Sequence, residues 1–256
     1  MDYAAALLDE TRAFGELIRT GDLALAVPSC PEWNLGQLFR HVGRGNRWAA
    51  QIIADRLDRP LDPRDVVDGK PPAETDAAID WLHDGAQRVL DAVAQSGSDT
   101  PAWTFLGPRP SSWWVRRRLH EATVHRADAV QALSGGLADF NLSAELAADG
   151  LEEWLDLVIP RFGSDGYGLP LTDGHSVHLH ATDDGLGTAG EWTISRPAGA
   201  DKLTWSHEHG KGSVALRGSA RDLFLTLMRR VAVADTDIAV FGDATVWQDW
   251  VDHTAF

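Results

Sequence analysis

The first 160 residues repeat apolar side chains at the three- and four-residue spacing of amphipathic helices. This spacing predicts helices over residues 3–19, 34–57, 75–95, 111–133 and 143–159. Asn34 and Gln37 have the spacing of a capping box at the start of the second helix, and Gly135 with Gly136 ends the fourth. The first four helices, joined by loops, predict a bundle.

The pattern changes after residues 160–174, which hold two prolines and four glycines. Beyond them, short segments alternate or carry β-branched and aromatic residues between turn signals. They predict strands over 175–183, 191–198, 201–208, 212–219 and 236–242, and helices over 220–231 and 244–253. The expected fold is therefore mainly α, with a helical bundle over 1–162 followed by a small α+β domain over 172–256.

Composition and charge argue against several classes of function and location. Hydrophobic residues make up 44% of the chain and charged residues 24%, which is typical of a globular protein. The net charge of -15 repels phosphate backbones and argues against a nucleic-acid partner. No apolar run is long enough to span a membrane, the N-terminus lacks the basic start of a secretory signal, and the single cysteine cannot form an internal disulfide. We therefore expect a cytoplasmic monomer or homodimer.

The strongest chemical signal lies on two predicted helices. Glu121 and His125 stand four residues apart on one face of the fourth helix, and His41 lies on the second. Two histidines and a glutamate form one of the ligand sets of catalytic zinc sites. A glutamate and histidine at this spacing are more often an exposed helix pair, and a lone histidine on an apolar face is more often a core residue, so spacing alone does not establish a metal site.

Two separated motifs carry a resemblance to a known family. The stretch "VPSCPEWNLGQLFRHVG", residues 27–43, contains Pro31, Trp33 and His41 at the spacing of the first motif of the mycothiol-dependent maleylpyruvate isomerase family. The fourth predicted helix contains the second motif in order: Arg118, Glu121, His125 and Asp128. The chain thus resembles this family, a branch of the DinB-like four-helix metalloproteins, and its second half is similar to the family's smaller C-terminal α+β domain.

The resemblance implies that His41, Glu121 and His125 bind Zn²⁺ or another divalent metal, with mycothiol as a cosubstrate. It implies an enzyme that activates this small thiol for addition to an electrophilic substrate, either as an isomerase acting on a maleylpyruvate-like acid or as a thiol S-transferase. We expect catalytic roles for Asp128, as a hydrogen-bond acceptor that orients His125, and for Arg118, as a cation that attracts an anionic ligand. A surface carboxylate and a solvated arginine are the alternatives.

Other features are weaker candidates. Cys30 has no cation or base beside it, and its flanking prolines favour a conformational role. Histidine pairs at 178/180 and 207/209 each share a strand face, but neither has an obvious third ligand. Arg217, Arg229 and Arg230 are alternative anion binders. A non-enzymatic metal- or ligand-binding regulatory or stress-response module is the alternative to an enzyme.

Overall fold

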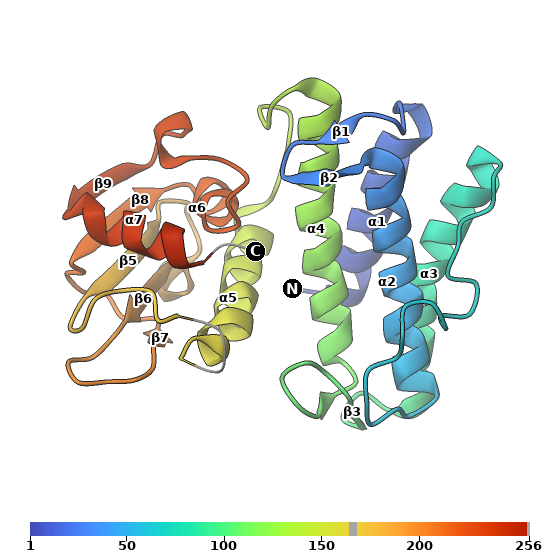
Figure 1. The fold of residues 1–256 in the computed structure, drawn as a ribbon, viewed down its shortest axis with the longest axis horizontal. Coiled ribbons are helices and arrows are strands. Elements are labelled where there is room, and N and C mark those ends of the chain that lie inside the picture. The colour runs from blue at the N-terminus through green and yellow to red at the C-terminus, as the bar shows by residue number, and fades with distance from the viewer. Residues whose placement is uncertain (164–167, 255–256) are drawn as a thin grey trace. The chain divides into compact units, whose positions relative to one another are not determined.

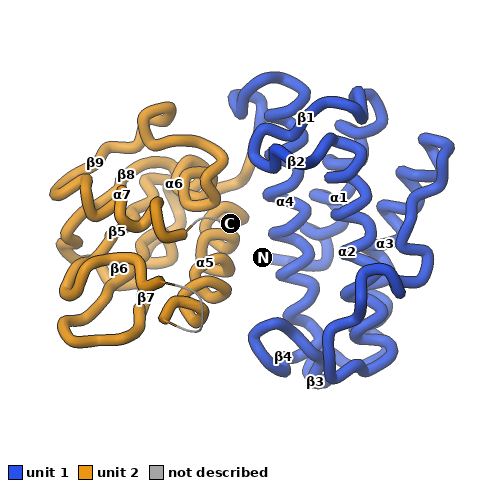
Figure 2. Tube along the Cα trace, viewed as in Figure 1, with its two compact units in different colours: residues 1–140 blue, residues 141–256 orange. Residues whose placement is uncertain are grey.

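The computed structural model describes residues 1–163 and 168–254, and it divides the chain into two compact units. Unit 1 comprises residues 1–140 and unit 2 comprises residues 141–256 (Figure 2). The helix expected over 143–159, assigned from the sequence to the bundle, falls in unit 2. It does so because its apolar face packs against a helix of that unit, and periodicity cannot tell which core a helix will join.

Unit 1, which is described throughout, places four long helices side by side (Figure 1). They are α1 (Tyr3–Thr20), α2 (Leu35–Ala54), α3 (Thr75–Ser96) and α4 (Trp113–Ser134). Asn34 and Gln37 form the expected capping box at the start of α2, and Gly135 ends α4 in the left-handed conformation at φ 77°. The helices therefore begin and end close to the predicted residues.

The core of unit 1 lies between these helices. It includes Phe14 from α1, Leu38 from α2, Leu82 from α3 and Ala129 from α4, all fully buried. Helices α2 and α3 approach closely at Gly43, where an added Cβ would lie 2.1 Å from the Trp81 ring. The absence of a side chain at this position allows the indole to lie directly on the backbone of α2.

Two short hairpins complete unit 1. Strands β1 (Ala26–Val27) and β2 (Cys30–Asn34) pair antiparallel across one end of the helices, and β3 (Pro101–Ala102) pairs with β4 (Arg109–Pro110) (Figure 1). The sequence did not predict strands here, because segments this short have no readable alternation. The β1–β2 hairpin leads directly into α2 and places Ser29 in its turn.

Unit 2 contains a mixed sheet and further helices. The sheet order is β7-β6-β5-β8-β9, with β5 and β8 parallel and the other neighbours antiparallel. Its strands are β5 (Ser176–Ala181), β6 (Glu191–Ser195), β7 (Thr204–Ser206), β8 (Val214–Gly218) and β9 (Ala239–Gly242). The α-helices are α5 (Ala144–Val158), α6 (Ala220–Leu227) and α7 (Ala244–His253), with short 3-10 helices at Ile159–Arg161, Gly187–Gly190 and Val233–Asp235.

The expected fold class is confirmed: a mainly α chain in which a helical unit precedes a small α+β unit. In unit 2, α5 packs on α6, while α6 and α7 contact β5 and β8. Within the described part of the chain, none of the helices has the length and apolar character needed to cross a membrane.

Candidate metal centre

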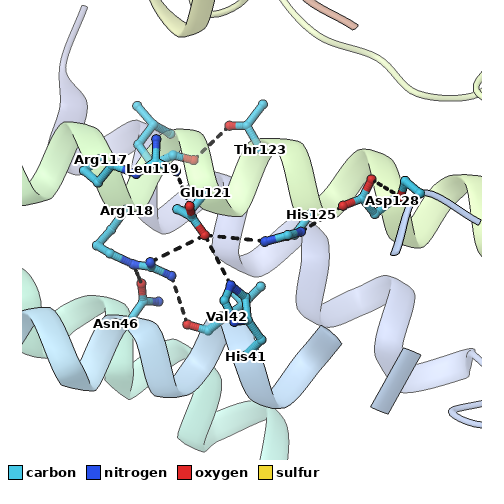
Figure 3. A network of polar contacts seen from close by, with 11 residues as sticks. His41, Val42, Asn46, Arg117, Arg118, Leu119, Glu121, Thr123, His125 and Asp128 are labelled. Carbon is cyan, nitrogen blue, oxygen red and sulfur yellow. Dashed lines mark hydrogen bonds and ion pairs between the residues drawn. The ribbon is translucent and has the colours of Figure 1, made fainter. Parts of the chain in front are cut away.

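The structure brings His41, Glu121 and His125 together between α2 and α4 (Figure 3). One donor atom from each residue lies within 4.8 Å of the other two. Glu121 Oε2 is 3.4 Å from His41 Nε2 and 3.4 Å from His125 Nε2. The four-residue spacing on α4 aligns two donors on one helical face, and the packing of α2 supplies the third.

This donor set fits a divalent metal. Imidazole nitrogen and carboxylate oxygen bind Zn²⁺ at about 2.0–2.2 Å, so tetrahedral ligands lie about 3.4 Å apart. The two separations from Glu121 Oε2 already have this value. A metal held by these three protein ligands would have one position left for a small molecule, and the His41 side chain is 39% exposed to solvent.

Asp128 and Ser29 orient His125. Asp128 Oδ2 accepts a hydrogen bond from His125 Nδ1 at 2.8 Å, and Asp128 Oδ1 accepts one from the Ser29 hydroxyl at 2.6 Å. Asp128 is completely buried, so its carboxylate is fixed in direction. With a metal bound, a proton on Nδ1 would leave the lone pair of His125 Nε2 to coordinate it in place of the hydrogen bond to Glu121, as the outer partners of metal-binding histidines usually arrange.

Two arginines set the charge of Glu121. Arg117 donates a hydrogen bond to Glu121 Oε1 from one helical turn before it, and Arg118 Nη1 lies 3.7 Å from Oε2. Burial by itself raises the pKa of Glu121, but the charge of Arg117, hydrogen bonds from both histidines and the charge of Arg118 outweigh it. The pKa of Glu121 therefore lies well below its usual range, and this residue is an anionic ligand near neutral pH.

The two histidines differ in their electrostatics. Burial lowers the pKa of His41 and outweighs the hydrogen bond with Glu121. Burial acts in the same direction on His125, but hydrogen bonds with Asp128 and Glu121 outweigh it, so the pKa of His125 is raised. The Trp33 ring lies beside both imidazoles, with its centroid 4.8 Å from that of His41 and 6.4 Å from that of His125.

Arg118 is held by groups inside unit 1. Its Nε donates to Asn46 Oδ1 at 2.9 Å and its Nη2 donates to the Val42 carbonyl at 3.2 Å. Gly45 leaves room for the guanidinium, since an added Cβ there would lie 2.6 Å from Nη2. With a side chain only 6% exposed, Arg118 is placed to act on Glu121 rather than to reach far into solvent.

The sequence missed three residues of this network. The Arg117 side chain reaches the Glu121 carboxylate, and its four-residue spacing was a signal that could have found it. Ser29 and Asn46 gave no signal, because their contacts depend on how the hairpin and α2 pack against α4. Cys30 lies on β2, packed against the apolar core of unit 1.

Comparisons with known proteins identify two family domains that cover most of the chain. Residues 4–130 match the family profile of the mycothiol maleylpyruvate isomerase N-terminal domain, and residues 145–249 match that of the MDMPI C-terminal domain. A search of curated proteins found no match.

Two solved structures share the fold. One is a crystal structure of the mycothiol-dependent maleylpyruvate isomerase with a histidine replaced by alanine; the TM-score is 0.57 at 13% identity, covering 93% of this chain and 92% of the other. The second is a crystal structure of the mycothiol-dependent maleylpyruvate isomerase, with a TM-score of 0.55 at 14% identity, covering 88% and 86%. At such identities the likeness concerns the fold, while the two profile matches, which together span most of the sequence, carry the assignment. The chain belongs to the mycothiol maleylpyruvate isomerase family.

Proposed function

We propose that this protein is a zinc-dependent enzyme that activates a small thiol, mycothiol, for addition to an electrophilic substrate. The observation that carries the proposal is the convergence of His41, Glu121 and His125, with donor atoms within 4.8 Å of one another, in a chain of this family. A divalent cation held by these residues would lower the pKa of a coordinated thiol, so that the thiol reacts as the more nucleophilic thiolate.

The chain's own residues have separate tasks in this proposal. His41, Glu121 and His125 hold the metal, and Asp128 keeps the proton of His125 on Nδ1. Arg117 and Arg118 keep Glu121 ionised. We assign Arg118 a positioning role, because its guanidinium is bound to Asn46 and Val42 and is almost completely buried.

Two reaction classes are consistent with this chemistry. In an isomerase the thiol adds to an activated double bond, the new single bond rotates, and elimination returns the thiol. In a transferase the carbon–sulfur bond persists and the thiol is consumed. We favour the isomerase class, acting on an unsaturated keto acid, because both matched domains are those of an isomerase family.

Metal analysis tests the site. Purified protein loaded with zinc and dialysed should retain metal at this centre, and His41→Ala, Glu121→Ala and His125→Ala should each lose it. His253→Ala, on the exposed end of α7, is a matched control and should retain it. Equal zinc retention in all four variants would overturn the site.

Turnover tests the activity. With mycothiol and maleylpyruvate, product should form while the concentration of free thiol stays constant. A thioether product with loss of free thiol would replace the isomerase by a transferase. Tight metal binding without thiol-dependent turnover of any electrophile would favour a regulatory module instead.

A further inference from the structure

A second group of metal-binding side chains lies in unit 2, on the sheet. Along β5, Val177 and Leu179 are buried on one face, and His178 and His180 alternate to the opposite face. Strand β6 places Glu191 directly opposite His180 in the antiparallel register. This face therefore carries three side chains of the types that bind metal ions, His178, His180 and Glu191.

The loop from 207 to 213 joins β7 to β8 and approaches strands β5 and β6. Gly212 permits the close approach, because an added Cβ would lie 2.9 Å from the backbone nitrogen of His178. The Thr193 hydroxyl donates to the Glu208 carbonyl at 2.8 Å and fixes the loop to β6. His178 is only 4% exposed, and the centroid of the His209 ring lies 5.7 Å from that of the His178 ring.

Glu191 joins one histidine from the strand to one from the loop. Its Oε2 lies 3.1 Å from His178 Nε2 and 2.5 Å from His209 Nδ1, and the three donor atoms lie within 4.8 Å of one another. The sequence paired each histidine with its neighbour in the chain and found no third ligand. In the structure, one histidine of each pair contacts Glu191: His178 from the first pair and His209 from the second.

We propose that His178, Glu191 and His209 form a second binding site for a divalent transition metal of the zinc type. The donor set is the two-imidazole, one-carboxylate combination that such ions accept. One ligand is buried in the sheet while the His209 side chain is 75% exposed, so an ion can enter from the loop side. The loop between β7 and β8 and two strands of the sheet would then share one ion.

The site has a conformational consequence. His209 belongs to the loop, whereas His178 and Glu191 belong to β5 and β6, so a shared ion clamps the loop onto the sheet. Lys211 lies in the same loop, two residues after His209, and is exposed. Zinc should therefore protect the chain from trypsin cleavage after Lys211, which provides a readout separate from affinity and from enzymatic activity.

The experiment uses the full chain with the first centre removed by His41→Ala and His125→Ala. This background variant should still bind one equivalent of zinc, and the bound zinc should slow trypsin cleavage after Lys211. Adding His209→Ala or Glu191→Gln should weaken zinc binding by at least about 100-fold, since even outer partners of metal ligands are worth about 10- to 100-fold. Both substitutions avoid the buried His178, and circular dichroism checks that each variant is folded.

His253→Ala, introduced in the same background, is the control and should leave zinc binding and protection unchanged. The proposal is overturned if the background variant binds no zinc, or if His209→Ala and Glu191→Gln retain it as well as His253→Ala does. The proposed function is tested separately. If the first centre holds no metal, the wild type and the background variant will bind the same amount of zinc, and His209→Ala will still weaken zinc binding.

Discussion

Asp128→Asn offers a sharp test of how the first centre is built. The substitution keeps the size of this completely buried side chain but removes its negative charge. It is the charged carboxylate that accepts the hydrogen bond from His125 Nδ1. Partners of this type usually contribute about 10- to 100-fold to metal affinity. At 1.4 kcal/mol for each factor of ten, we expect zinc binding to weaken by about 1.4–2.8 kcal/mol.

A competition titration with a chromophoric chelator measures this difference. NMR titration of the zinc-free protein adds an independent signature, since loss of the Asp128 carboxylate removes an interaction that raises the pKa of His125. The pKa of His125 should therefore fall in the variant. Ser29→Ala, which removes only the hydroxyl that holds Asp128 Oδ1, should weaken zinc binding less than Asp128→Asn does.

Glu10→Gln is the matched control. Glu10 is a largely buried carboxylate of unit 1 that accepts two hydrogen bonds from Arg126, away from the centre. Its loss should lower stability but leave zinc affinity within about twofold, as expected of sites that share no partners. If Asp128→Asn binds zinc as tightly as Glu10→Gln does, Asp128 does not orient His125 and the role assigned to it is wrong.

Three further predictions concern stability. Gly43→Ala drives a Cβ into Trp81 and should lower the free energy of unfolding by about 1–2 kcal/mol in denaturant titrations, whereas Gly36→Ala, whose nearest neighbours lie at 3.5 Å, should not destabilise the protein. Burial and the nearby Arg12 lower the pKa of His83, so the folded state binds a proton on this residue less tightly than the unfolded chain does. The free energy of unfolding should therefore fall as the pH drops below about 6.5. In His83→Gln this fall should be smaller. Removing metal with a chelator should lower the melting temperature of the wild type, and zinc at about 100 times its Kd should restore about 2.7 kcal/mol; His41→Ala should lose the part of this response that belongs to the first centre.

The sequence predicted most of the fold because each long helix carries local signals. Asn34 with Gln37 and Gly135 with Gly136 mark helix ends through contacts a few residues away, and those contacts form as expected. The sequence assigned α5 to the bundle, whereas the structure places it in unit 2, because this outcome depends on a contact between distant parts of the chain. Its apolar face is visible in the sequence, but the helix that covers this face, α6, lies some 60 residues further along the chain.

The same distinction between local and long-range contacts applies to the first centre. Glu121 and His125 share a helical face by spacing, so their proximity follows from α4 alone. His41 required the family resemblance, because no local pattern shows that α2 lies against α4 at this point. Ser29 lies 99 positions before Asp128 and reaches it only through the turn of a hairpin too short to be predicted.

Binding of a metal at the first centre would also change the local charge of the protein. Arg117 and Arg118 balance Glu121 and Asp128, so with neutral histidines the formal charge of this group is zero. The chain as a whole carries -15 and repels anions. A divalent cation held by His41, Glu121 and His125 would therefore turn the centre into a local positive site on an acidic protein. In the proposed enzyme, loading of the metal and recruitment of an anionic keto acid would depend on the same three side chains.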